Sequence, residues 1–270
     1  MDSVGLVTMS QHGAKMRIGM RRWHWWHLAL LGLIVLVALA PFDVSVARLC
    51  YSHPAARPVV RILQITAYFA SNGVGVLVIL IALVALGYSK LSRVPQLISA
   101  SLGAGLLADI VKLCVCRGRP LSIDLSSATF SSTFHGFFPL LSVGSRGQSF
   151  PSGHAATAAG LAISLSLRFP RGRWVFMFAA ATAAVSRVIV HAHFPTDVAA
   201  GAMLGGTWAV ACYQGFLGSA FLQIERKLEH IGARRTGNHP GKSAPQHEFA
   251  SELNVSQVAL TIRENHSDAA

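Results

Sequence analysis

The sequence predicts an all-α membrane protein with six transmembrane helices. Only 13% of its 270 residues are charged and 52% are hydrophobic, whereas a soluble domain has about 25% charged residues. The mean hydropathy is +0.48. The apolar residues are gathered into six stretches, several of them somewhat shorter than the ~20 residues that a spanning helix needs.

Polar connections separate the six expected spans. The spans cover residues 25–41, 74–88, 95–115, 154–169, 174–189 and 198–221. Trp23, Trp25 and Trp26 would anchor the first span at the membrane interface, where aromatic residues gather. The stretch 44–70 contains two prolines and three arginines, so we expect a loop with interfacial helical pieces there. The first span lacks a convincing cleavage site, which favours a retained signal anchor.

Positive charge is shared unequally between the two ends of these spans. Fifteen of the 23 Lys and Arg residues would lie on the side of the N-terminal tail. The positive-inside rule therefore places both termini in the cytoplasm. We expect a cytoplasmic tail over residues 1–24 and a six-helix membrane domain over 25–221. The polar segment 222–270 would be a second cytoplasmic tail, with a composition typical of disorder.

The net charge of +12 raises the question of a nucleic-acid partner. The basic residues lie in short runs between apolar spans, a pattern that favours membrane orientation and anionic lipid headgroups. We therefore expect membrane lipids as partners and no nucleic acid. Cys114 and Cys116 lack the spacing of a metal-binding pair, and Cys212 lies in an apolar span. A disulfide between Cys50 and Cys116 would require both to face one compartment.

Three short motifs place charge and histidine beside the ends of expected spans. Charge is costly there, so it indicates a functional site. The motifs are Lys112, six residues, Arg119-Pro120; then Pro151-Ser152-Gly153-His154; then Ser186-Arg187, five residues, His193, three residues, Asp197.

The second motif is typical of a helix start. Ser152 is an expected N-cap, and the free N–H groups of a helix N-terminus bind anions. Gly153 would let an anion approach the backbone closely. The alternative is a simple capped helix start, with His154 as an interfacial residue.

The cations of the motifs suit a bound phosphate. Arginine binds phosphate oxygens in a bidentate manner, and lysine acts as a point charge; the candidates are Lys112, Arg119 and Arg187. The alternative for each cation is a side chain that reaches from a helix end to the membrane surface. We favour that interpretation for Arg117 and Arg146.

His193 and Asp197 are four residues apart. Asp197 would lie in the first turn of a helix and reach back to His193. A carboxylate bonded to one ring nitrogen fixes the tautomer and makes the other nitrogen a better nucleophile. The alternative is an aspartate that only stabilises the helix dipole. We interpret His191 as an interfacial histidine beside the site.

A metal site is the competing interpretation of these residues. His154, His191, His193 and Asp197 have the side chains that bind zinc. The cations nearby would repel a metal ion and favour an anion, so we expect no metal and no other cofactor.

In order and spacing, the three motifs resemble the signature of the type 2 phosphatidic acid phosphatase superfamily, over roughly residues 95–221. The resemblance implies that His193 attacks phosphorus to form a phosphohistidine, that Asp197 orients it, and that His154 protonates the leaving oxygen. It also implies a phosphate-binding set without a metal, at the extracytoplasmic ends of the core helices. That set is Lys112, Arg119, Ser152, Gly153 and Arg187.

The resemblance implies a lipid phosphate or diphosphate as the substrate, because a headgroup would meet the site at the membrane surface. The chain resembles the bacterial inner-membrane members of this superfamily, so we expect an envelope lipid such as a lipid A phosphate or undecaprenyl diphosphate. The alternatives are a phosphatidylglycerophosphate or phosphatidate phosphatase, a lipid-to-lipid phosphotransferase, and a non-catalytic lipid-binding or transport protein. The segment 121–150 would form either an interfacial lid or an ordinary amphipathic loop.

Overall fold

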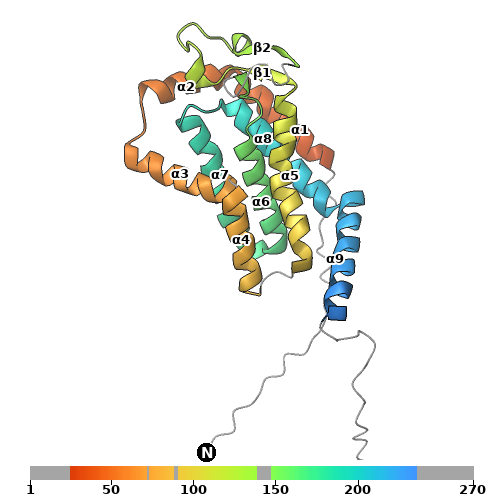
Figure 1. Cartoon of the computed structure of the whole chain (residues 1–270). Helices are drawn as coiled ribbons and strands as arrows, with labels where there is room; N and C mark the ends of the chain where they lie inside the picture. The colour runs from red at the N-terminus through yellow and green to blue at the C-terminus, as the bar shows by residue number, and fades with distance from the viewer. Residues whose placement is uncertain (1–24, 72, 88–90, 139–146, 236–270) are drawn as a thin grey trace, which may run out of the picture. The chain divides into compact units, whose positions relative to one another are not determined.

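The computed structural model describes residues 25–71, 73–87, 91–138 and 147–235, and these residues are mostly helical (Figure 1). One compact unit extends to Glu225, and a second begins at Arg226. The α-helices are α1 (Trp25–Leu39), α2 (Asp43–Ser52), α3 (Arg57–Ser71), α4 (Gly73–Ala85), α5 (Val94–Lys112), α6 (Gly153–Arg168), α7 (Arg173–Ile189), α8 (Pro195–Tyr213) and α9 (Gly215–Arg235). The strands are β1 (Val115–Arg117) and β2 (Phe134–Phe137).

Helix α6 lies at the centre of the bundle and packs against α5, α7 and α8 (Figure 1). Helices that follow one another from α5 to α8 run in opposite directions. The C-terminal ends of α5 and α7 therefore lie at the same end of the bundle as the N-terminal ends of α6 and α8. This arrangement brings together residues that are up to 85 positions apart in the motifs, from Lys112 to Asp197.

Glycines let the backbone of α6 approach both of its neighbours. A Cβ atom on Gly160 would lie 2.2 Å from the carbonyl oxygen of Ala100 on α5. On α8, a Cβ atom on Gly201 would lie 2.2 Å from the carbonyl oxygen of Ser152, and one on Gly205 would lie 2.1 Å from that of Ala156. Such distances are far inside van der Waals contact, so only glycine permits this packing. The first turn of α6 is thereby held against α8.

Among the described residues, three helical segments are long and apolar enough to cross a membrane: Leu30–Ser52, Val94–Lys112 and Pro170–Ile189. The expected count of six is not confirmed. Helix α6 has only 16 residues, which at about 1.5 Å per residue gives ~24 Å, less than the ~30 Å hydrocarbon core of a bilayer. Much of α6 and α8 consists of small residues that face other helices, so these two helices need less apolar surface than a lipid-facing span.

Several boundaries differ from those that the sequence predicts. The apolar N-terminal stretch continues past Pro41, because this proline lies at the start of a 3₁₀ turn where it needs no N–H partner. The stretch 44–70, expected to be a loop with helical pieces, is mostly the two helices α2 and α3. The expected last span is interrupted, because α8 ends at Tyr213 and α9 begins at Gly215.

A small sheet corrects the all-α expectation. Strands β1 and β2 pair antiparallel, with Val115 opposite Phe137 and Cys116 opposite Gly136. The pair joins the segment after α5 to part of the segment 121–150. Residues 139–146, and with them Arg146, lie outside the described residues, as do the side chains of the three N-terminal tryptophans.

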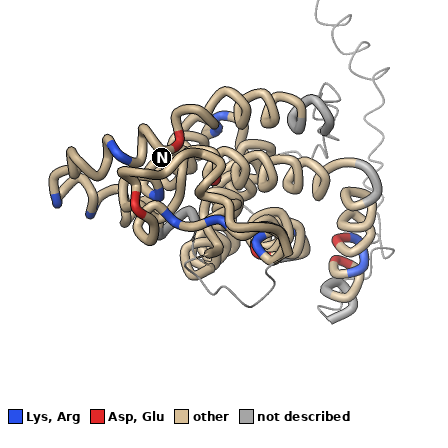
Figure 2. Tube along the Cα trace, turned by 90° about the horizontal axis from the view of Figure 1, so that it is seen from above, with Lys and Arg blue, Asp and Glu red and all other residues tan. Residues whose placement is uncertain are grey.

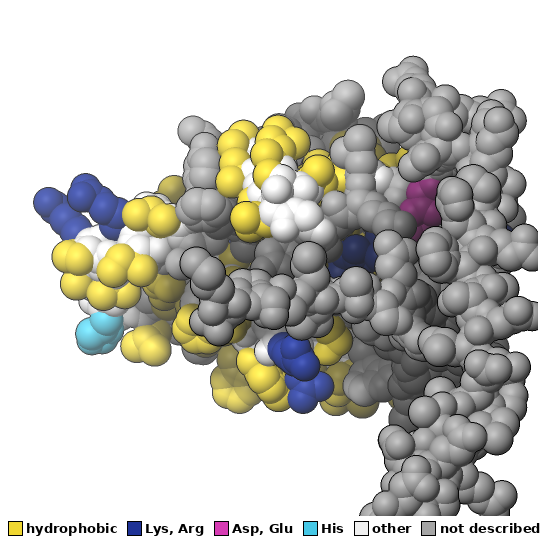
Figure 3. All heavy atoms as spheres, turned by 90° about the horizontal axis from the view of Figure 1, so that it is seen from below, with side chains coloured by type: hydrophobic (Ala, Val, Ile, Leu, Met, Phe, Trp, Pro, Cys, Tyr) yellow, Lys and Arg dark blue, Asp and Glu magenta, His cyan; other side chains and the backbone are white. Residues whose placement is uncertain are grey.

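The described surface is rich in exposed hydrophobic side chains, many of them on α1, α4 and α7 (Figure 3). Examples are Leu31, Val37, Ile81 and Phe178, each more than half exposed. Charged residues are sparse along the bundle helices, whereas α9, at the right of Figure 2, carries both signs of charge. An apolar surface of this extent is unfavourable in water and suits the hydrocarbon of a bilayer. All four cysteines are free thiols.

Candidate active site

Four core helices, α5 to α8, have ends that lie together at one end of the bundle. Most charged residues of the three motifs lie there. Lys112 ends α5, His154 lies in the first turn of α6, Arg187 in the last turn of α7 and Asp197 in the first turn of α8. Arg119 lies between β1 and α6, close enough to the Asp197 carboxylate for that charge to act on its guanidinium. The structure therefore brings together residues from all three motifs.

Lys112 lies beside the start of α6. A Cβ atom on Gly153 would lie 3.2 Å from the Nζ atom of Lys112. The same ammonium group is 2.7 Å from Oδ1 of Asp109, three residues earlier on α5, and Asp109 is largely exposed. The lysine charge is thus held next to the first N–H groups of α6.

Ser152 caps α6 as the sequence predicts. Its backbone is extended, and its hydroxyl oxygen accepts a hydrogen bond from the N–H of Ala155 at 3.4 Å. The N–H of Ser152 donates to the carbonyl oxygen of Asp197 at 2.9 Å. This bond ties the N-terminal end of α6 to the first turn of α8.

Two arginines of the site have a buried hydrogen-bond donor that is left unsatisfied among the described residues. The Nε atoms of Arg119 and Arg187 are buried and have no hydrogen-bond partner within the described part of the chain. Burial lowers the pKa of Arg119, against the opposing effect of the Asp197 charge. A buried cation with an unused donor is costly. A bound anion would offset that cost for both arginines.

His154 lies among positive charges. Burial lowers its pKa to about 4, and Arg187 contributes next, followed by the other cations of the site and His193. His154 is outside the three segments that are long and apolar enough to cross a membrane. With the protein charges alone, the ring is therefore neutral at pH 7. An anion would offset the cations and raise the pKa of His154 towards the range in which it donates a proton.

His193 is held by a backbone carbonyl. Its Nδ1 atom lies 2.7 Å from the carbonyl oxygen of Ser149. A carbonyl oxygen only accepts, so Nδ1 carries the hydrogen and Nε2 keeps its lone pair. We expected Asp197 to make this bond, but its Oδ2 atom is 3.8 Å from Nδ1, which is too long. The main chain of Ser149 thus fixes the tautomer.

Asp197 acts on His193 mainly through the groups around it. The Ser149 hydroxyl donates to Oδ2 of Asp197 at 2.6 Å, and the N–H of Phe194 donates to the same atom at 2.9 Å. The other oxygen, Oδ1, accepts from Arg117. Burial on its own raises the pKa of Asp197, but His193, Arg117 and Ser149 outweigh burial and leave the pKa below its usual value. Asp197 is therefore an ionised anchor for the loops on both sides of His193.

Arg117 is the functional candidate that the sequence analysis missed. We interpreted it as a side chain reaching for the membrane surface, and this was wrong, because Arg117 is 0% exposed. Its guanidinium carbon lies 4.3 Å from the ring centre of Phe194 and 4.5 Å from that of Phe134, in the range of cation–π attraction. The group is also bonded to two buried carboxylates, those of Asp43 and Asp197. Nothing in the sequence links Arg117 to Asp43, which is 74 positions away.

His191 lies next to the site in a turn. Its φ angle is +55°, in the left-handed region that residues other than glycine adopt rarely. The ring meets Tyr51 edge-on, with 5.7 Å between ring centres. In the same turn, the N–H of His193 donates to the carbonyl oxygen of Arg187 at 3.2 Å. This geometry fits the interpretation of His191 as a neighbour that helps turn the chain.

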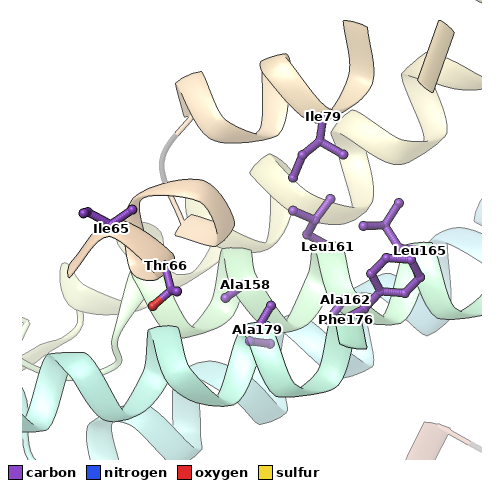
Figure 4. A pocket seen from close by; sticks show the side chains of 10 residues that line it. Ile65, Thr66, Ile79, Ala158, Leu161, Ala162, Leu165, Phe176 and Ala179 are labelled. Atoms are coloured by element: carbon purple, nitrogen blue, oxygen red, sulfur yellow. The ribbon is translucent and has the colours of Figure 1, made fainter. Parts of the chain in front are cut away.

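An apolar cavity of about 280 Å³ lies among α3, α4, α6 and α7 (Figure 4). Its lining includes Ala158 on α6 and Phe176, Ala179 and Ala180 on α7. Ala158 is one helical turn from His154, and Ala180 is two turns from Arg187, so each helix presents the cavity and the charged site on neighbouring parts of one face. The cavity therefore lies about one to two helical turns from the charged residues along α6 and α7.

The segment that carries these motifs is similar to one known family. Residues 93–219 match the model of the PAP2 superfamily. The match includes all three motifs and ends before the polar C-terminal segment.

Two curated relatives carry the same printed name, lipid A 1-phosphatase. The one from Rhizobium etli is 34% identical over 107 residues, and the one from Rhizobium johnstonii is 35% identical over 111 residues. Each match covers 40% of this chain, and the chain spans only 43% and 41% of the length of these relatives. A transmembrane PAP2-type phosphatidylglycerolphosphate phosphatase from Bacillus subtilis is similar with a TM-score of 0.47 and 19% identity, over 77% of this chain and 96% of that one.

Proposed function

We propose that this protein is a membrane-embedded, metal-independent phosphatase of an envelope lipid, with a lipid A phosphate as the first candidate. One observation carries the proposal: the uncompensated Nε donors of Arg119 and Arg187 belong to the same site as a histidine whose Nδ1 is bonded and whose Nε2 keeps its lone pair. Cations that lack a protein partner suit a phosphate, and the free ring nitrogen suits attack on it. The two lipid A 1-phosphatase relatives support the choice of substrate.

The proposed reaction has two steps. The lone pair on Nε2 of His193 forms a bond to phosphorus, and the P–O bond to the lipid breaks with its electron pair remaining on oxygen. His154 gives its proton to that oxygen. In the second step, the neutral His154 takes a proton from water, the water oxygen bonds to phosphorus, and the P–N bond returns its electrons to Nε2.

Lys112, Arg119 and Arg187, with Ser152 and the N–H of Gly153, would stabilise the charge on the phosphoryl oxygens in both steps. Such fixed charges are the main contribution to phosphoryl transfer. They would do the work that a metal ion does elsewhere, so we propose that no metal or other cofactor takes part. The apolar cavity beside α6 would accept one hydrocarbon chain of the substrate.

The proposed location is the bacterial inner membrane, with both termini in the cytoplasm and the site on the extracytoplasmic side. The distribution of Lys and Arg supports this orientation. A lipid headgroup on the outer leaflet would then reach the charged end of the bundle while its chains stay in the bilayer.

Phosphate release from purified lipid phosphates tests the proposal. The panel contains lipid A, undecaprenyl diphosphate, phosphatidylglycerophosphate and phosphatidate, each with the full chain in detergent and with excess EDTA. We expect release from at least one lipid, unaffected by EDTA and inhibited by vanadate. Loss of activity in EDTA that returns with a divalent metal would contradict the metal-independent mechanism. Specific lipid binding without release would favour a lipid-binding protein, and transfer to an added lipid acceptor would favour a phosphotransferase.

A further inference from the structure

We propose that Asp43 and Arg117 are positioning residues for the nucleophile His193. They would act through Asp197 and Ser149 rather than by contact with the substrate. This inference rests on the proposed function and adds a residue that lies outside the segment that matches the superfamily, since Asp43 precedes residue 93.

Asp43 joins the first membrane segment to the site. It is the first residue of α2 and is 0% exposed. Its Oδ2 atom accepts from a terminal nitrogen of Arg117 at 2.6 Å, and its Oδ1 atom accepts from the N–H of Thr196 at 2.9 Å. The Thr196 hydroxyl also donates to Asp43. Both carboxylate oxygens are therefore used, and both accept a hydrogen bond from Thr196 in the first turn of α8.

Arg117 links Asp43 to the loops around His193. Its other terminal nitrogen donates to Asp197 and, at 2.7 Å, to the hydroxyl of Thr196. Its backbone carbonyl accepts from the N–H of Ser149 at 3.0 Å. Ser149 in turn supplies the carbonyl that holds Nδ1 of His193. One buried arginine thus fixes both Asp197 and Ser149, the two residues that hold the nucleophile.

The charges of this network favour a positive ring on His193. The network contains one guanidinium and two carboxylates, each fully buried. The negative charge of Asp43 neutralises the positive charge of Arg117. The negative charge of Asp197 is then not neutralised and can act on the imidazole of His193. When Nε2 bonds to phosphorus the ring becomes positive, and the charge of Asp197 stabilises it. Without the carboxylate of Asp43, Asp197 would compensate Arg117 instead.

Charged and titratable groups on the neighbouring elements lie around the site that contains His193, and the experiment must separate their effects. They are Asp43 on α2, Arg117 on β1, Arg119 after β1, Lys112 on α5, His154 on α6, Arg187 on α7 and Asp197 on α8. Only Asp43 and Arg117 belong to the network without being part of a motif. Substitutions at Asp43 therefore change the charge near His193 while all motif residues remain.

Asp43→Asn in the full chain tests the inference, with Asp124→Asn as the matched control. Asp124 is an exposed acid that bonds only to its own turn, at Ser126 and Ser127. We expect Asp43→Asn to lower kcat by about 10- to 100-fold with little change in KM, because a small displacement of a reacting group is that costly. The pH profile of kcat/KM should also differ from that of the wild type, since the substitution removes a buried negative charge from the network. The control should keep the wild-type profile.

Thr196→Val is the second variant, because it keeps the shape of the side chain and removes only its hydroxyl. The ring resonances of His193, followed by NMR of ring-labelled histidine, are the second measurement and need no turnover. We expect both variants to shift the Nδ1–H resonance, because it reports the hydrogen bond to the Ser149 carbonyl oxygen. Unchanged ring resonances and a kcat within twofold of wild type in Asp43→Asn would overturn the inference. If wild-type protein releases no phosphate from any lipid, the proposed function fails, while the NMR comparison still decides the positioning role.

Discussion

At the residue scale, the arginines of the site differ in how the protein compensates their charge. Arg117 has two buried carboxylates and three aromatic rings around it. Arg119 and Arg187 have Nε donors with no partner among the described residues. A buried cation that loses its partner is strongly destabilising, whereas a buried donor without a partner can bind a ligand. This difference supports the proposal that Arg117 holds the site together and that the other two arginines bind the phosphate.

His154 gives a prediction on pH. Its pKa is about 4 among the cations of the site, and an anion should raise it. Binding therefore takes up a proton, and affinity rises as the pH falls through the raised pKa. We expect sulfate, which keeps its charge over this range, to bind more tightly at pH 5 than at pH 7.5 by calorimetry. His154→Asn should bind sulfate with a flatter pH dependence, and an identical slope in both proteins would show that His154 is not the group that titrates.

At the element scale, the site depends on the close contact between α6 and α8. Ser152 and Asp197 are tied by a backbone hydrogen bond, and Gly201 permits that approach. The sequence predicts the helix start at Ser152 because N-cap residues act locally. It does not predict the contact with α8, because that contact arises from backbone packing between distant segments.

Gly201→Ala should separate these two helices. The added Cβ atom would lie 2.2 Å from the Ser152 carbonyl oxygen, a backbone atom that cannot move freely. We expect a loss of about 1–3 kcal/mol in stability and a large loss of activity, measured by thermal unfolding and phosphate release. Gly206→Ala is the matched control, because its Cβ atom would meet only the end of the Ile163 side chain, at 3.1 Å. Equal effects of the two variants would contradict this account of the contact.

The apolar cavity gives a prediction on chain length. Ala158→Leu should fill part of the cavity and hinder a long hydrocarbon chain. The chain of the substrate would enter the cavity from the hydrocarbon of the bilayer rather than from water, so the substitution removes only packing contacts and no hydrophobic burial. We therefore expect KM to rise by roughly 3- to 10-fold for a long-chain phosphate. Hydrolysis of a short-chain phosphate should not change. Ala181→Leu, at an exposed position of α7, is the control, and a rise in KM for both chain lengths would argue against a chain in the cavity.

At the scale of the whole molecule, each motif is a short local stretch of sequence, whereas the residues that hold the motif side chains in place come from distant parts of the chain. Spacing and residue type are enough to predict which histidines, cations and carboxylate share a site, since each motif lies at a helix end. They do not predict that the Ser149 carbonyl, rather than Asp197, holds His193. They also do not predict the Asp43–Arg117 pair, because buried ion pairs depend on how distant segments pack. The prediction of six spans stays unconfirmed for a similar reason, since central helices such as α6 are covered by protein and have little lipid-facing surface.

The central claim is that His193 is the nucleophile, and trapping the phosphoenzyme tests it most directly. Purified full-length protein is mixed with phosphate-labelled lipid substrate, quenched in alkali within one turnover, and analysed by peptide mass spectrometry. The account predicts a phosphoryl group on His193 that is absent in His193→Gln, in which phosphate release is also lost. A phosphorylated residue other than His193, or undiminished phosphate release from His193→Gln, would contradict it.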